Sequence, residues 1–292
     1  MKTYYELEPE QNTFDLLVAD ITHKCNMECA NCYIPNRDVP DMDEQKLYSF
    51  LKRLPNRIVV RLIGAEPTMR NDLPDLIREV KKCGHNVSLT TNGLKLASKK
   101  YIKSLKDASL RMVLISMNGA DDPEIYKVMD DGGEYSALKV KALENCMEMN
   151  MIVNTGTIIA KGTNESTIKR QIELVKECMH RTNYKPKLMP LIRMKSVGSI
   201  GRYMENSAYS IKELEELFLN ECPEFKEDNT WPPNAGTLCR LYHDGEIYVR
   251  LIDWSIDEEG VPDAGNETRG RITPDWKCAP FFEHVKKNEF KY

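Results

Sequence analysis

Short apolar segments alternate with longer amphipathic segments over the first two thirds of the chain. Apolar segments of this length are typical of buried strands, and apolar residues at helical spacing are typical of helices that pack on a sheet. The predicted strands are 14–21, 58–63, 86–90, 112–116, 151–159 and 186–192. The predicted helices are 43–53, 73–83, 99–106, 136–149 and 165–180. Because strands that alternate with helices pair in parallel through right-handed crossovers, we expect an α/β fold, a partial (β/α)6 TIM-like barrel.

The composition changes after about residue 200, where Pro, Gly, Asp and Asn become frequent. The dipeptide Asp244-Gly245 joins two short alternating runs, and Asp-Gly in that position is a strong β-hairpin signal. We therefore expect a barrel over residues 1–200 and a small C-terminal cap, containing this hairpin, over residues 201–292.

The overall composition excludes several classes of protein. With 41 basic and 45 acidic residues, the net charge of -4 gives no general field that attracts nucleic acid or an anionic membrane. No apolar run reaches the roughly 18 residues of a membrane span, and the polar start of the chain does not resemble a signal peptide. The 9 cysteines are an odd count in a chain too large to need disulfides, so we expect a reducing, cytoplasmic location.

Three cysteines follow the first predicted strand at C-x3-C-x2-C spacing: Cys25, Cys29 and Cys32. Three soft ligands so close together favour a thiolate-bound metal centre. In a parallel barrel this loop lies at the C-terminal strand ends, where active sites are built. A structural zinc site with His23 as fourth ligand is the alternative, although such sites usually combine two paired knuckles.

The cysteine loop and the Gly-Ala-Glu-Pro turn at 64–67, after the second strand, together resemble the radical S-adenosylmethionine (SAM) superfamily. The resemblance implies that Cys25, Cys29 and Cys32 hold a [4Fe–4S] cluster whose open iron binds SAM. It also implies an external electron donor, such as a flavodoxin or ferredoxin. Reductive cleavage of SAM would then give a 5′-deoxyadenosyl radical that abstracts hydrogen from a substrate.

The resemblance extends to residues that would contact SAM. It places Gly64 and Glu66 at the SAM amino group, and small residues do let backbone carbonyls approach a ligand. It places Ser116 or Asn118, at the end of the fourth strand, at the ribose hydroxyls. Without the preceding cysteine motif, this turn would be interpreted as an ordinary turn in which Glu66 is solvated.

Two further SAM contacts are expected from the resemblance. The family usually has an aromatic residue before the third cysteine, but this chain has Asn31 there, so adenine packing would fall to Tyr33 or Ile34. Arg193, expected just past the sixth strand, would bind the SAM carboxylate through its guanidinium group. The alternative is an ordinary surface position, which is more common for an arginine.

The remaining cysteines divide into two groups. Three lie on predicted helices and are expected to be small core residues: Cys83, Cys146 and Cys178. Three lie in the C-terminal segment: Cys222, Cys239 and Cys278. The segment 237–250 resembles the hairpin of SPASM and twitch domains and of the GTP cyclase of molybdopterin synthesis, but no thiol stands where those relatives place the next cysteine. We expect a domain of this type without its auxiliary cluster; an irregular site from the three cysteines is the alternative.

The substrate is left open between two classes within this enzyme family. One is a peptide or protein side chain; the other is a nucleotide-like metabolite that is rearranged as in the molybdopterin pathway. The C-terminal segment offers basic and aromatic residues for a phosphorylated ligand, or for a cap whose charges face water: Arg240, Arg250, Arg269, Arg271, Tyr242, Tyr248, Trp254 and Trp276. A non-catalytic metal-binding regulator on the same barrel is the alternative outside the enzyme class.

Overall fold

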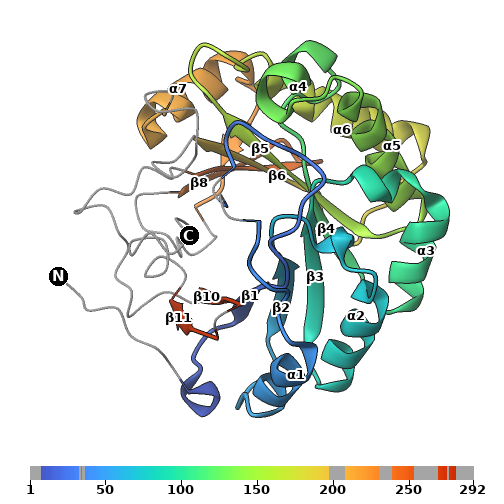
Figure 1. The fold of residues 1–292 in the computed structure, drawn as a ribbon. Helices are drawn as coiled ribbons and strands as arrows, with labels where there is room; N and C mark the ends of the chain where they lie inside the picture. Colours follow the sequence, from blue (N-terminus) through green and yellow to red (C-terminus); the bar gives the residue numbers. More distant parts are fainter. Residues whose placement is uncertain are drawn as a thin grey trace.

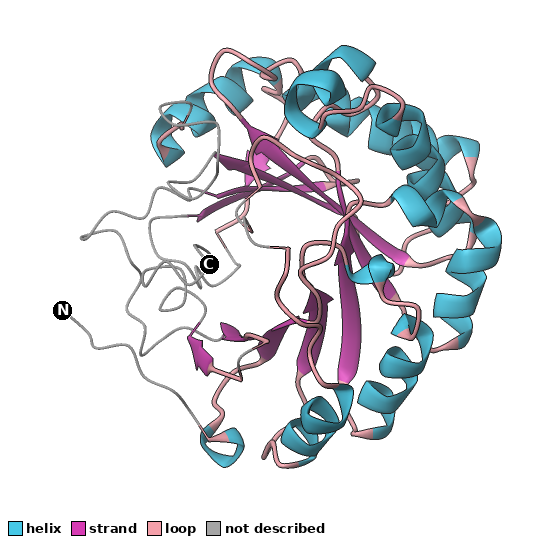
Figure 2. Ribbon diagram, viewed as in Figure 1, coloured by secondary structure: helices cyan, strands magenta, loops and turns pink. Residues whose placement is uncertain are grey.

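The computed structural model describes residues 8–32, 34, 37–196, 208–229, 239–252, 269–274 and 276–280. In these ranges eleven strands form one sheet in the order β11-β10-β1-β2-β3-β4-β5-β6-β9-β8-β7. Helices lie along the outside of the curved sheet, and the strands enclose the interior (Figures 1 and 2). The sheet is an open, partial barrel, which confirms the predicted fold class.

All six predicted strands are present and parallel. They are β1 Leu16–Asp20, β2 Val59–Ile63, β3 Asn86–Thr91, β4 Met112–Ser116, β5 Ile152–Ile159 and β6 Leu191–Ser196. The helices between them are α1 Glu44–Lys52, α2 Leu73–Lys82, α3 Lys99–Asp107, α4 Pro123–Asp130, α5 Tyr135–Glu148 and α6 Thr167–Arg181. Three short 3-10 helices are η1 Pro9–Gln11, η2 Pro67–Met69 and η3 Leu94–Ala97. Of the α-helices between these strands, α4 was not predicted; Asp122 caps it by accepting a hydrogen bond from the Glu124 amide.

The described strands of the C-terminal segment extend the barrel sheet. The segment contains α7 Ile211–Glu221, β7 Lys226–Glu227, β8 Cys239–His243, β9 Tyr248–Ile252, β10 Arg269–Ile272 and β11 Cys278–Pro280. The predicted hairpin is β8–β9, and β9 pairs in parallel with β6 at one edge. At the other edge β10 pairs in parallel with β1. The predicted boundary after residue 200 and about half of the predicted cap fall on residues outside the described ranges.

Strand alternation separates an apolar outer face from an inner face that mixes polar and apolar residues. Leu17, Val60 and Leu89 point outward and are buried against the helices. Helix α2 buries Leu73, Leu76, Ile77 and Val80 at helical spacing. Each such side chain contributes roughly 1.5–3 kcal/mol by leaving water. The alternate positions on the same strands point into the barrel and are free to be polar, which is where the site is built.

No helix in the described part of the chain is long and apolar enough to cross a membrane.

Candidate functional site

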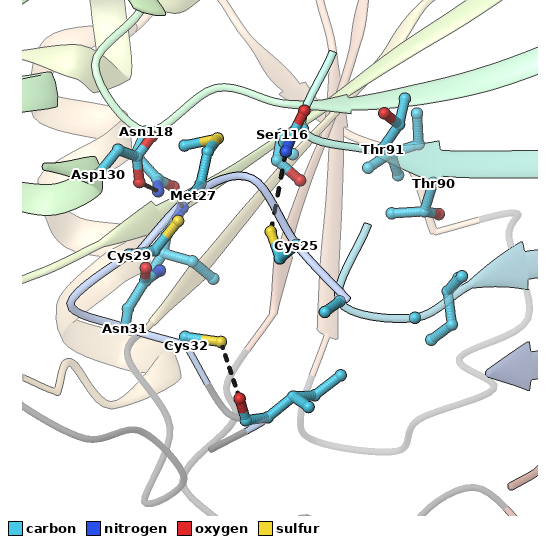
Figure 3. Close-up of a pocket in the computed structure, with 18 of the residues that line it drawn as sticks. Cys25, Met27, Cys29, Asn31, Cys32, Thr90, Thr91, Ser116, Asn118 and Asp130 are labelled. Carbon is cyan, nitrogen blue, oxygen red and sulfur yellow. Dashed lines mark hydrogen bonds between the residues drawn. The ribbon is translucent and has the colours of Figure 1, made fainter. Parts of the chain in front are cut away.

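A cavity of about 200 Å³ lies at the C-terminal ends of the barrel strands. The three cysteines of the loop after β1 line one side of it (Figure 3). Much of the remaining lining comes from the following strands and the turns at their ends, including Ile63, Gly64, Thr90, Thr91, Leu114, Ser116, Gly156, Ile158 and Lys195. Asp130 of α4 and Lys139 of α5 also line it. The structure therefore brings the cysteine motif and the predicted strand-end residues into one space.

The cysteine loop is anchored to its neighbours at several points. Met27 is buried at the centre of the loop, and the Ala30 amide donates to the Met129 carbonyl at 2.8 Å. The Asn92 side chain lies 4.0 Å from the Cys25 Sγ. Burial raises the pKa of the Cys25 and Cys29 thiols. These contacts hold the loop in place while the thiols face the cavity.

Cys32 lies beside a cation that sequence reasoning missed. The Arg37 Nη2 lies 3.3 Å from the Cys32 Sγ, and Arg37 also lines the cavity. The Cys32 thiol donates to the Ile34 carbonyl at 3.5 Å, and Ile34 itself is buried against the cavity. Tyr33, the other predicted adenine contact, lies outside the described residues.

The turn after β2 binds the cysteine loop through its backbone. The Ala65 amide donates to Thr22 at 2.9 Å and the Glu66 amide to Lys24 at 2.9 Å. A Cβ at position 64 would lie 2.0 Å from the Thr22 carbonyl oxygen, so only glycine allows this approach. Gly64 and Ala65 line the cavity.

The Glu66 carboxylate is buried and saturated with donors. Its Oε1 accepts from the Thr68 amide, the Thr68 hydroxyl and the Thr91 hydroxyl, and its Oε2 accepts from the Asn92 amide. Burial raises the pKa of Glu66, and these hydrogen bonds oppose that rise. The carboxylate therefore ties the end of β2 to the end of β3, and Glu66 is not among the side chains that line the cavity.

Ser116 and Asn118 both line the cavity, but their side chains differ in what they already bind. The Asn118 amide donates to Asp130 at 2.8 Å, and its oxygen accepts from the Ile158 amide at 3.1 Å. The Ser116 hydroxyl makes no hydrogen bond within the described part of the chain. Of the two predicted ribose contacts, Ser116 thus has the uncommitted side chain.

A buried ion pair, not predicted from the sequence, supports this side of the cavity. The Lys139 Nζ lies 3.0 Å from the Asp130 carboxylate, and both side chains are at most 1% exposed. The same Nζ donates to the Ser116 carbonyl at 2.9 Å. Asp130 ends a helix that was not predicted, so no local signal could have joined it to Lys139.

Arg193 lies within β6 rather than just past it. The strand continues to Ser196, and Arg193 pairs in register with Gly156 on one side and Arg250 on the other. It is not among the residues that line the cavity, whereas Lys195 is. The prediction was wrong in position because it ended the strand at residue 192.

The other cysteines are mostly core residues. Those that are buried are Cys146, Cys178, Cys222 and Cys278, and Cys83 packs against the edge of the core. Cys239 is half-buried, with the Arg250 Nη2 at 3.1 Å from its Sγ. Trp254, another predicted residue of this segment, lies outside the described residues.

A parallel α/β barrel with a triplet of cysteines at the strand ends defines a class of metalloenzyme. The family model described as "Radical SAM superfamily" matches residues 20–175, and the chain belongs to that family. The family assignment supports a [4Fe–4S] cluster and SAM as cofactors. The chain spans only 33% and 50% of the length of the first two curated relatives that it matches.

Individual relatives differ in what they do. The 7,8-dihydro-6-hydroxymethylpterin dimethyltransferase of Methanocaldococcus jannaschii is 29% identical over 54% of this chain and 33% of its own length. The GTP 3′,8-cyclase of Peptoclostridium acidaminophilum is 24% identical over 93% of both chains. The crystal structure of Streptococcus suis SuiB bound to the precursor peptide SuiA has a TM-score of 0.63 at 14% identity, and the match covers 95% of this chain and 63% of that one. This last likeness shows the fold alone.

The residues at the cavity fit a cluster better than a single ion. Within the described ranges no three His, Cys, Asp or Glu side chains are arranged to hold one metal ion. Each thiolate of a cluster binds a different iron, so the three need not converge on one point. His23, the fourth ligand of the zinc alternative, is buried and does not line the cavity.

Proposed function

We propose that Cys25, Cys29 and Cys32 ligate the [4Fe–4S] cluster, and that the enzyme abstracts hydrogen from a peptide side chain or a small metabolite. The observation that supports this most is the placement of all three thiols on one cavity at the strand ends. When bound, the cluster and SAM supply a one-electron cleavage whose product radical attacks an unactivated C–H bond. Anaerobic reconstitution followed by assay of SAM cleavage with dithionite tests the proposal.

The chain's own residues would position SAM and exclude water. The backbone of Gly64 and Ala65 offers carbonyl groups to the amino end, and Ser116 offers a hydroxyl to the ribose. Ile34, already buried against the cavity, offers an apolar surface for the adenine, with Tyr33 beside it in sequence.

Three further residues are proposed to act on SAM, either directly or through the groups around them. Asn118 would reach the ribose while it stays bonded to Asp130. Glu66 would act on the SAM amine mainly through the turn that it holds together. Contact of Arg193 with the SAM carboxylate has less support, because that side chain lies outside the cavity lining.

Glu66→Ala is expected to weaken SAM binding by about 1.5–3 kcal/mol while the cluster stays intact. Loss of the carboxylate leaves the buried Thr91 hydroxyl and Asn92 amide without their acceptor, so the free energy of unfolding should also fall by about 1–3 kcal/mol. Titration with SAM and urea unfolding measure the two effects.

Glu79→Ala, on the exposed side of α2, is the matched control for Glu66→Ala and should change neither quantity. An unchanged SAM affinity in the folded Glu66→Ala protein would restrict Glu66 to a structural role.

A second candidate substrate class is a nucleotide-like metabolite that undergoes rearrangement. The GTP 3′,8-cyclase of Peptoclostridium acidaminophilum supports it, since that similarity extends over nearly the whole of both chains. The chain spans only a third of the dimethyltransferase, so methyl transfer has weaker support.

About four irons per chain are expected after reconstitution, because one cysteine triplet faces a cavity in the described part of the chain. Replacement of Cys222, Cys239 or Cys278 by Ala should each leave that iron content unchanged. Iron and sulfide analysis checks this. Seven or eight irons, half of them lost in Cys239→Ala, would establish an auxiliary cluster instead.

We also propose a cytoplasmic enzyme that receives electrons from a small donor such as a flavodoxin or ferredoxin and does not bind nucleic acid. The odd cysteine count supports the location, and the net charge of -4 supports the lack of nucleic-acid binding. The electron donor is proposed from the family resemblance.

A further inference from the structure

Basic side chains gather on the inner face of the barrel, below the cavity. They are Arg61 on β2, Arg193 and Lys195 on β6, Arg250 on β9 and Arg269 on β10. Their strand neighbours Leu62, Met194 and Leu251 belong to the outer hydrophobic core, so alternation directs these basic residues inward. We call this set the basic interior.

The members of the basic interior converge from two sides of the barrel. Arg193 and Arg250 are register partners on the adjacent strands β6 and β9. Arg61 lies on β2, which is separated from β6 in the sheet by β3, β4 and β5. Burial lowers the pKa of Arg193 well below its usual range, and the charges of Arg61 and Arg250 lower it further. Burial, with the charge of Arg269 next, lowers the pKa of Arg61 to about 10. The direction of both pKa shifts agrees with the placement of these like charges on one inner face.

Three members of the basic interior, Arg61, Arg193 and Arg250, have no acidic partner among the described residues. Asp20 is the acidic residue on the inner face of the described strands, and it forms a buried ion pair with Arg271. Within the same ranges Arg61, Arg193 and Arg250 form no ion pair, and the Arg193 Nε is buried without a hydrogen-bond partner. Like charges held together in a partly desolvated space destabilise the fold unless an anion joins them.

The arrangement of these guanidinium groups determines which kind of anion they can bind. At least three guanidinium groups face one interior space, and each presents a planar fork of donors that matches phosphate oxygens. An oligophosphate concentrates several charges within a few bonds. An extended acidic peptide spaces its carboxylates at roughly 3.3 Å per residue and on alternate sides, so it cannot direct them to one point.

We propose that the basic interior binds the oligophosphate group of a small organic substrate, with Arg61, Arg193 and Arg250 as its principal contacts. Lys195 belongs to the basic interior and also lines the cavity of the cysteine loop, so the two spaces adjoin. A substrate anchored by its phosphates would therefore present its organic part to the SAM side. This inference rests on the proposed function and names the substrate class for the same site.

The test is calorimetric titration of the reconstituted protein with tripolyphosphate, without SAM, at constant ionic strength. Arg61→Gln and Arg193→Gln should each weaken tripolyphosphate binding about tenfold or more, as expected for loss of a charge-assisted contact. Arg193→Lys should retain part of the affinity. Arg78→Gln, on the outer surface of α2, is the control and should bind as the unmodified protein does.

A second readout separates a binding role from a structural one. Because Arg61 and Arg193 form no ion pair in the described structure, their replacement by Gln should leave the melting temperature of the ligand-free protein unchanged or raise it. Tripolyphosphate should raise the melting temperature of the unmodified protein and have a smaller effect on the two variants.

Several outcomes would overturn the proposal. Equal tripolyphosphate affinity in the unmodified protein and in both Gln variants would remove the basic interior as its site. Sulfate binding as tightly as tripolyphosphate would show unspecific charge attraction, and tighter binding of a hexaglutamate peptide would assign the interior to a peptide. SAM cleavage is measured separately, so an enzyme that cleaves SAM and ignores tripolyphosphate refutes this inference alone. A protein that binds tripolyphosphate and never cleaves SAM refutes the proposed function alone.

Discussion

Cys25→Ala, Cys29→Ala and Cys32→Ala are each expected to lose the iron–sulfur cluster and, with it, all reductive cleavage of SAM. The three thiols line one cavity, and a cluster with one open iron needs all three remaining irons ligated. Iron and sulfide analysis after anaerobic reconstitution measures the first loss. Release of methionine from SAM under dithionite measures the second.

These variants should remain folded, because each thiol is only half-buried and lies in a loop outside the hydrophobic core. Unfolding free energies should change by no more than about 1 kcal/mol. Cys83→Ala is the control, since Cys83 is also half-buried but lies on the far side of the sheet from the cavity lining. If one of the three loop variants kept full iron and activity, the ligand assignment would be wrong.

The sequence predicted the strands well where local pattern decides them and less well where proline intervenes. The sixth strand was expected at 186–192 but lies at Leu191–Ser196. The expected range contains Pro186 and Pro190, which cannot donate hydrogen bonds to a central strand, so pairing begins only after them. This shift moved Arg193 from a loop to the inner face of the barrel.

The C-terminal strands show which strand pairings the sequence cannot predict. The Asp-Gly turn predicted the hairpin β8–β9, because hairpin pairing is local. Its pairing with β6, and that of β10 with β1, joins residues far apart in sequence, and no short-range pattern specifies such partners. The glycine at position 270 is one residue that this pairing requires. A Cβ there would lie 2.2 Å from the Phe14 ring, so β10 approaches β1 closely only because residue 270 is glycine.

The residues of the candidate site also differ in whether the sequence alone could predict them. The cysteine triplet could be predicted because its ligands lie within eight residues. Arg61 and Lys195 could not, since in the sequence each is an ordinary basic residue, and only the curved sheet places both on its inner face. Spacing along the chain therefore revealed the proposed metal site, whereas the basic interior emerged only from the fold.

Lys139→Met is expected to lower the free energy of unfolding by about 3–5 kcal/mol, because it leaves the Asp130 carboxylate buried without its cation. Lys139 also donates to the Ser116 carbonyl and lies over the Tyr126 ring at 4.9 Å, so these contacts are lost as well. Urea unfolding of the cluster-free protein measures the effect. Lys141→Met, on an exposed position of the same helix, should change it by no more than about 0.5 kcal/mol.

The double variant Asp130→Asn with Lys139→Met should recover part of that loss, since it removes both buried charges together. Asn118 donates to Asp130, and the neighbouring Met129 carbonyl binds the cysteine loop at Ala30, so the single variant should also disturb the cavity. We therefore expect Lys139→Met to weaken SAM binding even at temperatures where it stays folded, and the double variant to weaken it less. A Lys139→Met protein as stable as Lys141→Met would show that water reaches Asp130, and that this ion pair does not support the cavity wall.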